Sequence, residues 1–380
     1  MRQALLNARV LLDTGFVDGQ AVLLEGGRIA DVVATTDPRI ATADLRHDLA
    51  GQLLLPGFID TQVNGGGGVL FNDAPDVATI RRIGAAHRRF GTTGFLPTLI
   101  SDDLDVVARA IEATDAAIAA GVPGVIGIHI EGPFLSSARR GTHDPSKLRS
   151  LDAAALPLLT SLQRGRTLVT LAPELAGVGM VQRLVDAGVI VAAGHTNATH
   201  RDIAAALREG LRGFTHLFNA MSQLTVREPG VVGAALEDRS SWCGIIVDGR
   251  HVDPVVLRLA LRCKPVDRFM LVTDAMPTVG ADAKSFNLQG KEISVEDGVC
   301  VDEMGVISGS DLDMSTAVRN AMTQLEVDLP TAVRMASLHP AAFLGLDHEL
   351  GRIATGYRAN LVAVDAELRV RATWIDGVVA

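Results

Sequence analysis

The chain has 380 residues and a formal net charge of −9, and only 4% of its residues are aromatic. It therefore lacks the basic surface and the stacking side chains that nucleic-acid binding requires. No window approaches the run of about 18 apolar residues that a membrane span needs. Asn7, Arg9 and Asp13 interrupt the N-terminal stretch where a signal peptide would need a continuous apolar segment. We expect a cytoplasmic protein with neither a nucleic-acid nor a membrane partner.

The three cysteines, Cys243, Cys263 and Cys300, lie far apart and form no CxxC pair. This spacing indicates neither a disulfide framework nor a thiolate metal site.

The two ends of the chain resemble each other and differ from the middle. Residues 1–53 read as short strands separated by turn signals, and residues 346–380 have the same alternating character. We expect both termini to form one small β-sandwich domain, with residues 54–345 inserted between its halves as a separate domain.

From residue 54 onward, short apolar β-branched runs alternate with amphipathic helical stretches, which is typical of βαβ units around a parallel sheet. Eight such units predict a closed (β/α)8 barrel, and a doubly wound sheet is the alternative. The expected strands cover 54–61, 93–100, 124–131, 167–174, 188–195, 211–216, 242–248 and 268–274, and the clearest helices cover 76–90, 104–120, 200–210 and 253–263.

Four further segments complete the inserted domain. An irregular stretch follows the sixth strand, and a β-rich insert at 293–310 follows the eighth. Helices are expected at 314–326 and 330–344.

Polar residues end four of the predicted strands. Glu131 ends the third, His195 the fifth, His216 the sixth and Asp274 the eighth. All carboxyl ends of barrel strands meet on one face, so these four side chains should converge. One glutamate and two histidines, with a position left open for water, match a catalytic rather than a structural zinc site.

Such a metal turns water into a nucleophile near neutral pH and polarises a carbonyl. The reaction then needs a proton acceptor, and Asp274, which is not needed as a ligand, can act as general base and then general acid.

Taken alone, any of these residues is more often a hydrogen-bonded structural residue than a ligand, and only the set of four favours a site. His129, two residues before Glu131, should lie deeper in the barrel and pack in the core. Glu174, after Pro173 at the end of the fourth strand, stays open between a structural turn and a site residue.

Seven motifs together resemble the N-acetylglucosamine-6-phosphate deacetylases of the amidohydrolase superfamily over nearly the whole chain: IHIEGPF (128–134), GTHDP (141–145), AGHTNA (193–198), THLFNAM (215–221), REPG (227–230), DGRHV (248–252) and VTDAMP (272–277). The resemblance implies metal-dependent hydrolysis of N-acetyl-D-glucosamine 6-phosphate to D-glucosamine 6-phosphate and acetate, by metal-activated water with Asp274 as the acid/base.

The resemblance also assigns the remaining site residues. It implies that His143 contacts the substrate beside the scissile amide as a catalytic residue, and that His251 and Arg227 bind the phosphate. One or both of these would reach into a neighbouring subunit, which implies a homodimer with a shared phosphate site. The backbone around Asn219 and Ala220 would help hold the sugar phosphate.

Three positions bear on the metal and the substrate. Many amidohydrolases carry HxH at the end of the first strand, where this chain has Gln62 and Asn64, and neutral amides are poor metal ligands. We expect one divalent ion per subunit, with zinc first and iron, cobalt or manganese as alternatives, and place both amides at the substrate. Asp311 departs from the small or polar residue expected there, which bears on the sugar hydroxyl contacts.

The same motifs leave two alternative functions open. The nearest is a deacetylase of N-acetylgalactosamine 6-phosphate or of another N-acyl amine. From a different class, the chain could be a non-catalytic amidohydrolase-like scaffold, but the presence of every ligand and of the acid/base argues against it.

Overall fold

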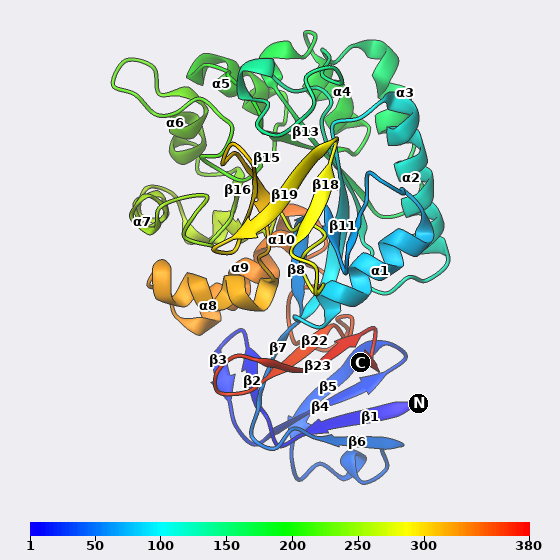
Figure 1. Ribbon diagram of the computed structural model, residues 1–380. Helices are drawn as coiled ribbons and strands as arrows, with labels where there is room; N and C mark the ends of the chain where they lie inside the picture. Colours follow the sequence, from blue (N-terminus) through cyan, green and yellow to red (C-terminus); the bar gives the residue numbers. More distant parts are fainter.

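Eight parallel strands follow one another around a barrel in chain order. The computed structural model describes residues 1–380, and its barrel strands are β8 (Phe58–Val63), β11 (Thr92–Ile100), β12 (Gly127–Glu131), β13 (Arg166–Leu171), β14 (Ile190–Ala193), β15 (Gly213–Phe214), β16 (Trp242–Ile245) and β17 (Phe269–Leu271) (Figure 1). Every residue of β8 and β11 is buried, as expected of parallel strands covered by helices.

The first and last strands meet, and this closes the barrel. The Asp274 amide donates to the Gln62 carbonyl at 3.0 Å, and Val63 pairs with Ala275. The predicted (β/α)8 barrel is therefore confirmed, and the doubly wound alternative is wrong.

The helices that cover the sheet were largely predicted. They are α1 (Val77–Arg88), α2 (Leu104–Ala119), α3 (Leu156–Leu159), α4 (Met180–Asp186), α5 (His200–Arg208), α6 (Gly230–Glu237), α7 (Pro254–Cys263), α8 (Met314–Gln324), α9 (Leu329–Ala336) and α10 (Leu338–Phe343). None of them is both long and apolar enough to cross a membrane.

The helix predicted over 330–344 is wrong in one respect, because it is two helices. The chain breaks at Ser337, whose φ of −136° and ψ of −71° lie outside the helical range.

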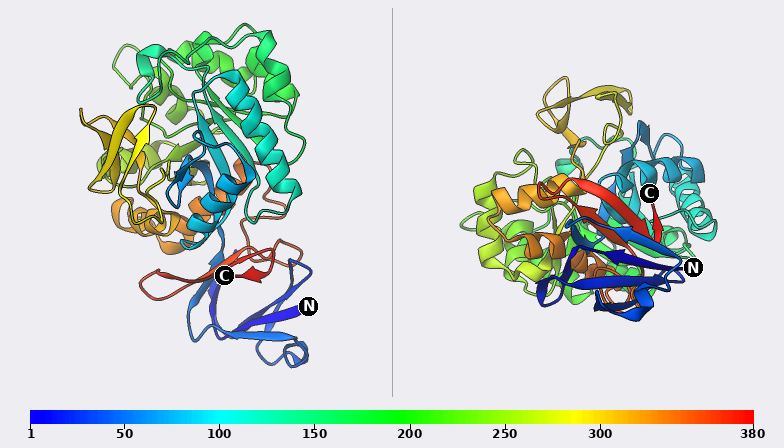
Figure 2. Two further views of the ribbon diagram at one scale, coloured as in Figure 1. Left: turned by 45° about the vertical axis from the view of Figure 1, so that its right-hand side comes forward. Right: turned by 90° about the horizontal axis from the view of Figure 1, so that it is seen from below.

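The insert after the eighth strand is an antiparallel sheet that begins earlier than predicted. It consists of β18 (Ser285–Leu288), β19 (Lys291–Glu296), β20 (Val299–Asp302) and β21 (Ile307–Ser310). In Figure 2 this sheet, in yellow, projects from the side of the barrel.

Both termini contribute to a β-sandwich at one end of the barrel (Figures 1 and 2). Its first sheet contains β1 (Arg2–Leu6), β4 (Gln20–Glu25), β5 (Arg28–Ala34) and β6 (Leu45–Asp48). The second contains β2 (Arg9–Leu12), β3 (Gly15–Val17), β7 (Leu53–Pro56), β22 (Leu361–Val364), β23 (Val370–Ile375) and β24 (Val378–Val379). Side chains such as Leu5, Leu24, Leu54 and Trp374 fill the space between them. The division that we propose between residues 53 and 54 falls inside β7.

Candidate metal centre and active site

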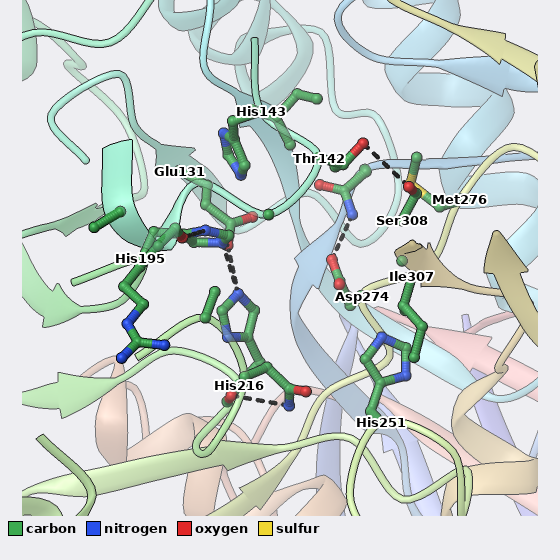
Figure 3. A pocket seen from close by; sticks show the side chains of 18 residues that line it. Glu131, Thr142, His143, His195, His216, His251, Asp274, Met276, Ile307 and Ser308 are labelled. Carbon is green, nitrogen blue, oxygen red and sulfur yellow. Dashed lines mark hydrogen bonds and ion pairs between the residues drawn. The ribbon is translucent and has the colours of Figure 1, made fainter. Parts of the chain in front are cut away.

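Glu131, His195 and His216 converge at the carboxyl ends of the barrel strands (Figure 3). Glu131 is the last residue of β12, and the histidines follow β14 and β15. His216 Nε2 lies 3.0 Å from Glu131 Oε1, and His195 Nε2 lies 3.3 Å from the same oxygen. The two Nε2 atoms are 3.0 Å apart. The three strands thus bring together, as predicted, three buried side chains that are distant in sequence.

The donor set fits a divalent metal. His195 Nδ1 lies 2.9 Å from the Arg139 carbonyl, so Nδ1 carries the hydrogen and Nε2 of the neutral ring holds a lone pair. That lone pair faces a carboxylate oxygen and a second imidazole nitrogen, an arrangement that a cation between them would stabilise. Burial, the largest single influence, works to lower the pKa of His216, but the hydrogen bond with Glu131 and the charges of Glu131 and Asp274 together raise it. The space between the ring and Glu131 therefore favours positive charge.

Three of the four strand-end residues have left-handed backbones. The φ values are 48° at His195, 32° at His216 and 53° at Asp274. A residue in this region cannot continue a strand. The strands therefore stop at Ala193, Phe214 and Leu271, two or three residues earlier than predicted.

Asp274 faces the cluster with one carboxylate oxygen held by two amides. Asn64 Nδ2 donates to Oδ1 at 2.7 Å, and Gln62 Nε2 donates to it at 3.1 Å. Gln62 Nε2 also lies 3.1 Å from both oxygens of Glu131, so it links the two carboxylates. Burial, and then the charge of Glu131, raise the pKa of Asp274.

His143 is fixed as a neutral hydrogen-bond donor by Ser101. Its Nδ1 accepts from the Ser101 hydroxyl at 2.7 Å and lies 3.3 Å from the Ser101 amide N–H. Burial, and then the charge of His195, lower the pKa of His143 to about 3. A neutral ring whose Nδ1 accepts must carry its hydrogen on Nε2. The ring centre lies 4.3 Å from that of His195, so this hydrogen is available beside the metal cluster.

These groups open onto a cavity of about 360 Å³. Its lining also includes Asn219, Ala220 and His251, as well as Ile307, Ser308 and Gly309 from the end of the insert. Figure 3 shows His251 and Ile307 on the side of Asp274, with His195 opposite. The cavity thus extends from the cluster of Glu131, His195 and His216 to His251. Because His251 does not end a predicted strand, the strand ends alone did not place it here.

Glu174, whose role the sequence did not decide, holds the loop that carries His195. It accepts from the Thr196 hydroxyl at 2.6 Å and from the Asn197 amide N–H at 2.7 Å. Asn197 Oδ1 in turn accepts from Arg139 Nε at 2.9 Å, and Arg139 supplies the carbonyl that orients His195. Sequence reasoning missed Ser101 and Arg139, because neither ends a predicted strand.

The sequence profile of the Amidohydrolase family matches residues 53–380, which is most of the chain. The chain belongs to the amidohydrolase family. An N-acetylgalactosamine-6-phosphate deacetylase from Shewanella sp. (strain ANA-3) is 43% identical to this amidohydrolase, over 97% of this chain and 94% of the relative.

Two solved structures are similar along the whole chain. An N-acetylglucosamine-6-phosphate deacetylase from Pasteurella multocida has a TM-score of 0.95 at 34% identity and full coverage of both chains. A variant of the N-acetyl-D-glucosamine-6-phosphate deacetylase from Mycobacterium smegmatis, in complex with N-acetyl-D-glucosamine 6-phosphate, has a TM-score of 0.90 at 33% identity, covering 100% of this chain and 99% of that one.

Three residues that the sequence analysis linked to the substrate do not line this cavity. Gln62 is 2% exposed and does not line the cavity. Arg227 is exposed on the irregular segment before α6, outside the lining. Asp311 pairs with Lys284 at 2.8 Å and does not line the cavity.

His129 lies in the core, in agreement with its expected packing role. Its Nε2 lies 2.7 Å from the Thr170 hydroxyl, and Thr170 lies 2.6 Å from Thr215. Burial lowers the pKa of His129 to about 4, so the ring is a neutral member of this hydrogen-bonded row.

Proposed function

We propose that this amidohydrolase removes the acetyl group of N-acetyl-D-glucosamine 6-phosphate and releases D-glucosamine 6-phosphate and acetate. The observation that carries the proposal is the cavity that joins the Glu131, His195 and His216 cluster to Asp274, His143 and His251. The solved relatives described above, one of them in complex with this sugar phosphate, support the same substrate.

The residues divide the reaction between them. His143 donates from Nε2 to the acetyl carbonyl oxygen, where negative charge develops as water adds to the carbonyl carbon. Asp274 accepts a proton from that water and returns it to the amine nitrogen as the C–N bond breaks, and the water oxygen leaves in acetate. Contacts with the distant phosphate hold the amide in place, which converts binding energy into orientation.

The metal is part of the proposal. A divalent ion bound by Glu131, His195 and His216 would supply an activated water and polarise the carbonyl. We propose zinc, because one carboxylate and two imidazoles suit it, with iron, cobalt and manganese as alternatives. Gln62 and Asn64 are hydrogen-bonded to carboxylates as amides, which supports one ion per subunit.

The remaining site and assembly assignments belong to the same proposal. His251 binds the phosphate in its own chain's cavity, whose lining includes it, together with the backbone around Asn219 and Ala220. Arg227 lies outside that lining, so we place it in the phosphate site of a second subunit in a homodimer. A cytoplasmic location, with all three cysteines as free thiols, completes the assignment.

A second candidate substrate is N-acetylgalactosamine 6-phosphate, which differs only in the configuration at one sugar carbon. The 43% identity to the Shewanella deacetylase, above that of the two solved structures, favours it. The proposed metal centre and Asp274 act on the amide, which both sugars share. The second substrate would therefore change the contacts with the sugar and leave the chemistry unchanged.

The deciding experiment measures acetate release from both epimeric sugar phosphates and from unphosphorylated N-acetylglucosamine, on protein of known metal content. We expect release from N-acetylglucosamine 6-phosphate, about one metal per chain, and a much lower kcat/KM without the phosphate. A higher kcat/KM for the galactosamine epimer would replace the substrate and keep the chemistry. No release from any of the three by metal-loaded protein would refute the proposal.

A further inference from the structure

A buried carboxylate that the proposed reaction does not use lies against His251. The side chain of Asp248 is only 4% exposed and that of His251 only 5%. Asp248 Oδ2 is 2.6 Å from His251 Nδ1, one of the shortest contacts around the cavity. A carboxylate buried to this extent needs partners for both oxygens.

Asp248 meets that need within its own loop. It lies between β16 and α7, and its Oδ1 accepts from the amide N–H groups of Arg250 and His251, each at 2.9 Å. The loop is tied to α8, because Asn320 Nδ2 donates to the Val247 carbonyl at 2.7 Å. One oxygen of Asp248 therefore shapes the loop, and the other contacts the ring.

The ring contact decides which nitrogen of His251 faces the substrate. Because Nδ1 donates to Asp248, Nε2 is the nitrogen left for the cavity that the ring lines (Figure 3). A neutral ring with its hydrogen on Nδ1 would present a lone pair at Nε2, and a lone pair repels a phosphate oxygen. Only the doubly protonated ring donates from both nitrogens.

Asp248 can stabilise that positive ring because it is itself ionised. Burial works to raise the pKa of Asp248, but its hydrogen bonds with His251 and Arg250, together with the charge of a protonated His251, lower it. Asp274 is the other carboxylate whose charge interacts with His251. A carboxylate in contact with a ring nitrogen stabilises the positive form of the ring.

We propose that Asp248 is a positioning residue that holds His251 as a cation with its Nε2–H directed into the cavity, so that His251 binds the phosphate of the substrate by a charge-assisted hydrogen bond. The inference rests on the proposed function, since it requires a phosphorylated substrate.

The test is Asp248→Asn in the full-length, metal-loaded enzyme. Asparagine keeps an oxygen for the two backbone contacts, but it places an amide where the ring needs a carboxylate. An amide N–H facing Nδ1 leaves a neutral ring that still donates from Nε2. Because charge-assisted hydrogen bonds are roughly twice as strong as neutral ones, we expect KM for the phosphorylated substrate to rise about tenfold, with kcat changed less than about twofold.

Three comparisons make the result specific. Unphosphorylated N-acetylglucosamine should show an unchanged kcat/KM, because the altered contact concerns only the phosphate. Asp253→Asn is the matched control, since Asp253 is an exposed carboxylate of the same loop that caps α7 and does not touch His251. His251→Asn should raise KM for the phosphorylated substrate further than Asp248→Asn does.

The outcomes separate this inference from the proposed function. An unchanged KM in Asp248→Asn together with a raised KM in His251→Asn would overturn the positioning role alone. An equal fall in kcat/KM for both substrates would show a general structural role and would overturn it as well. If His251→Asn leaves phosphate discrimination intact, both the inference and the phosphate assignment of His251 fail. Failure of the proposed function would appear in the unmodified enzyme, as absence of acetate release.

Discussion

Asp274 has both the location and the pKa that a general acid/base needs. The side-chain amides of Asn64 and Gln62 hold its Oδ1, and burial together with Glu131 raises its pKa. The carboxyl group can therefore carry a proton beside the place that we propose for the amide of the substrate. A metal in the cluster would act in the opposite direction by stabilising the carboxylate. A base that must also return its proton benefits from such opposing influences, because its pKa then lies nearer the working pH.

Asp274→Asn should therefore retain the metal and lose about 10³-fold in kcat, within the range for losing a general acid/base. Acetate release and metal content are measured on the same sample. Asp311→Asn is the control, since it removes a carboxylate that pairs with Lys284 outside the cavity. Turnover within tenfold of the unmodified enzyme would remove Asp274 from the mechanism.

Ser101 fixes the tautomer of His143, so that the ring hydrogen lies on Nε2. Ser101→Ala leaves Nδ1 with only the amide N–H at 3.3 Å, so the ring can adopt the wrong tautomer. We expect kcat to fall about tenfold, while KM stays within about twofold, because the lost contact serves the developing oxyanion. Ser337→Ala, which also removes a buried hydroxyl with a 2.6 Å hydrogen bond, should leave both constants unchanged. A rise in KM with a constant kcat would place His143 in substrate binding instead.

The site was predictable only to the extent that it depends on strand ends. Glu131, His195, His216 and Asp274 follow strands of one barrel, so their convergence is a consequence of topology. Ser101 lies 42 residues before His143, so the sequence does not show that the two side chains meet. His195 is oriented by a backbone carbonyl, and the contacts of a carbonyl cannot be read from residue types. Asp248 was in a recognised motif, but only the fold shows that its side chain turns back onto His251.

At the scale of elements, the seam between β8 and β17 is held by a buried acid. Asp60 Oδ1 accepts from the amide N–H groups of Gln62, at 3.1 Å, and Thr273, at 3.3 Å, and Oδ2 lies 2.5 Å from the Thr273 hydroxyl. Burial raises the pKa of Asp60 to about 7. Ionisation of Asp60 therefore costs folding free energy, because burial outweighs the hydrogen bonds that favour the charged form.

The sign of the pH effect follows from that shift. An unfolded aspartate has a pKa of about 3.9, so between about pH 4 and pH 7 the folded state keeps a proton that the unfolded state has lost. The contribution of Asp60 to stability is complete below about pH 4 and is lost as the pH rises through about 7. Asp60→Asn cannot ionise, so its Tm minus that of the unmodified protein should be more positive at pH 8 than at pH 5. Asp282→Asn, an exposed control, should show no such trend. A pH-independent difference would contradict the assignment.

The elements themselves were predicted more accurately than their ends. The eight strands and the main helices could be predicted because apolar periodicity is a local property of the sequence. The periodicity cannot show that His195 and His216 turn left-handed, since this depends on packing around the cluster. It also cannot show the break at Ser337, where both neighbouring segments have helical patterns.

At the scale of the whole molecule, exposed apolar side chains lie close in sequence to Arg227 and to the loop that carries His251. Val226 is 102% exposed and Leu224 60%, and both lie beside Arg227 in the irregular segment before α6. Val255 and Leu259 of α7 are 53% and 52% exposed, just after the loop that carries His251. Apolar side chains gathered near a binding site favour a subunit contact there, which supports the proposed homodimer.

Complementation between two inactive variants tests that arrangement. Arg227→Ala should lose the phosphate contact and Asp274→Asn the acid/base. If Arg227 acts in the partner's site, a mixed dimer contains one site with both residues intact. Random reassociation of equal amounts should then recover about a quarter of the unmodified activity, because half of the dimers are mixed and each has one working site. Light scattering on the same samples gives the oligomeric state. Mixed dimers that form without recovering activity would place Arg227 in its own chain's site or outside the reaction, and a monomeric active enzyme would exclude the shared site.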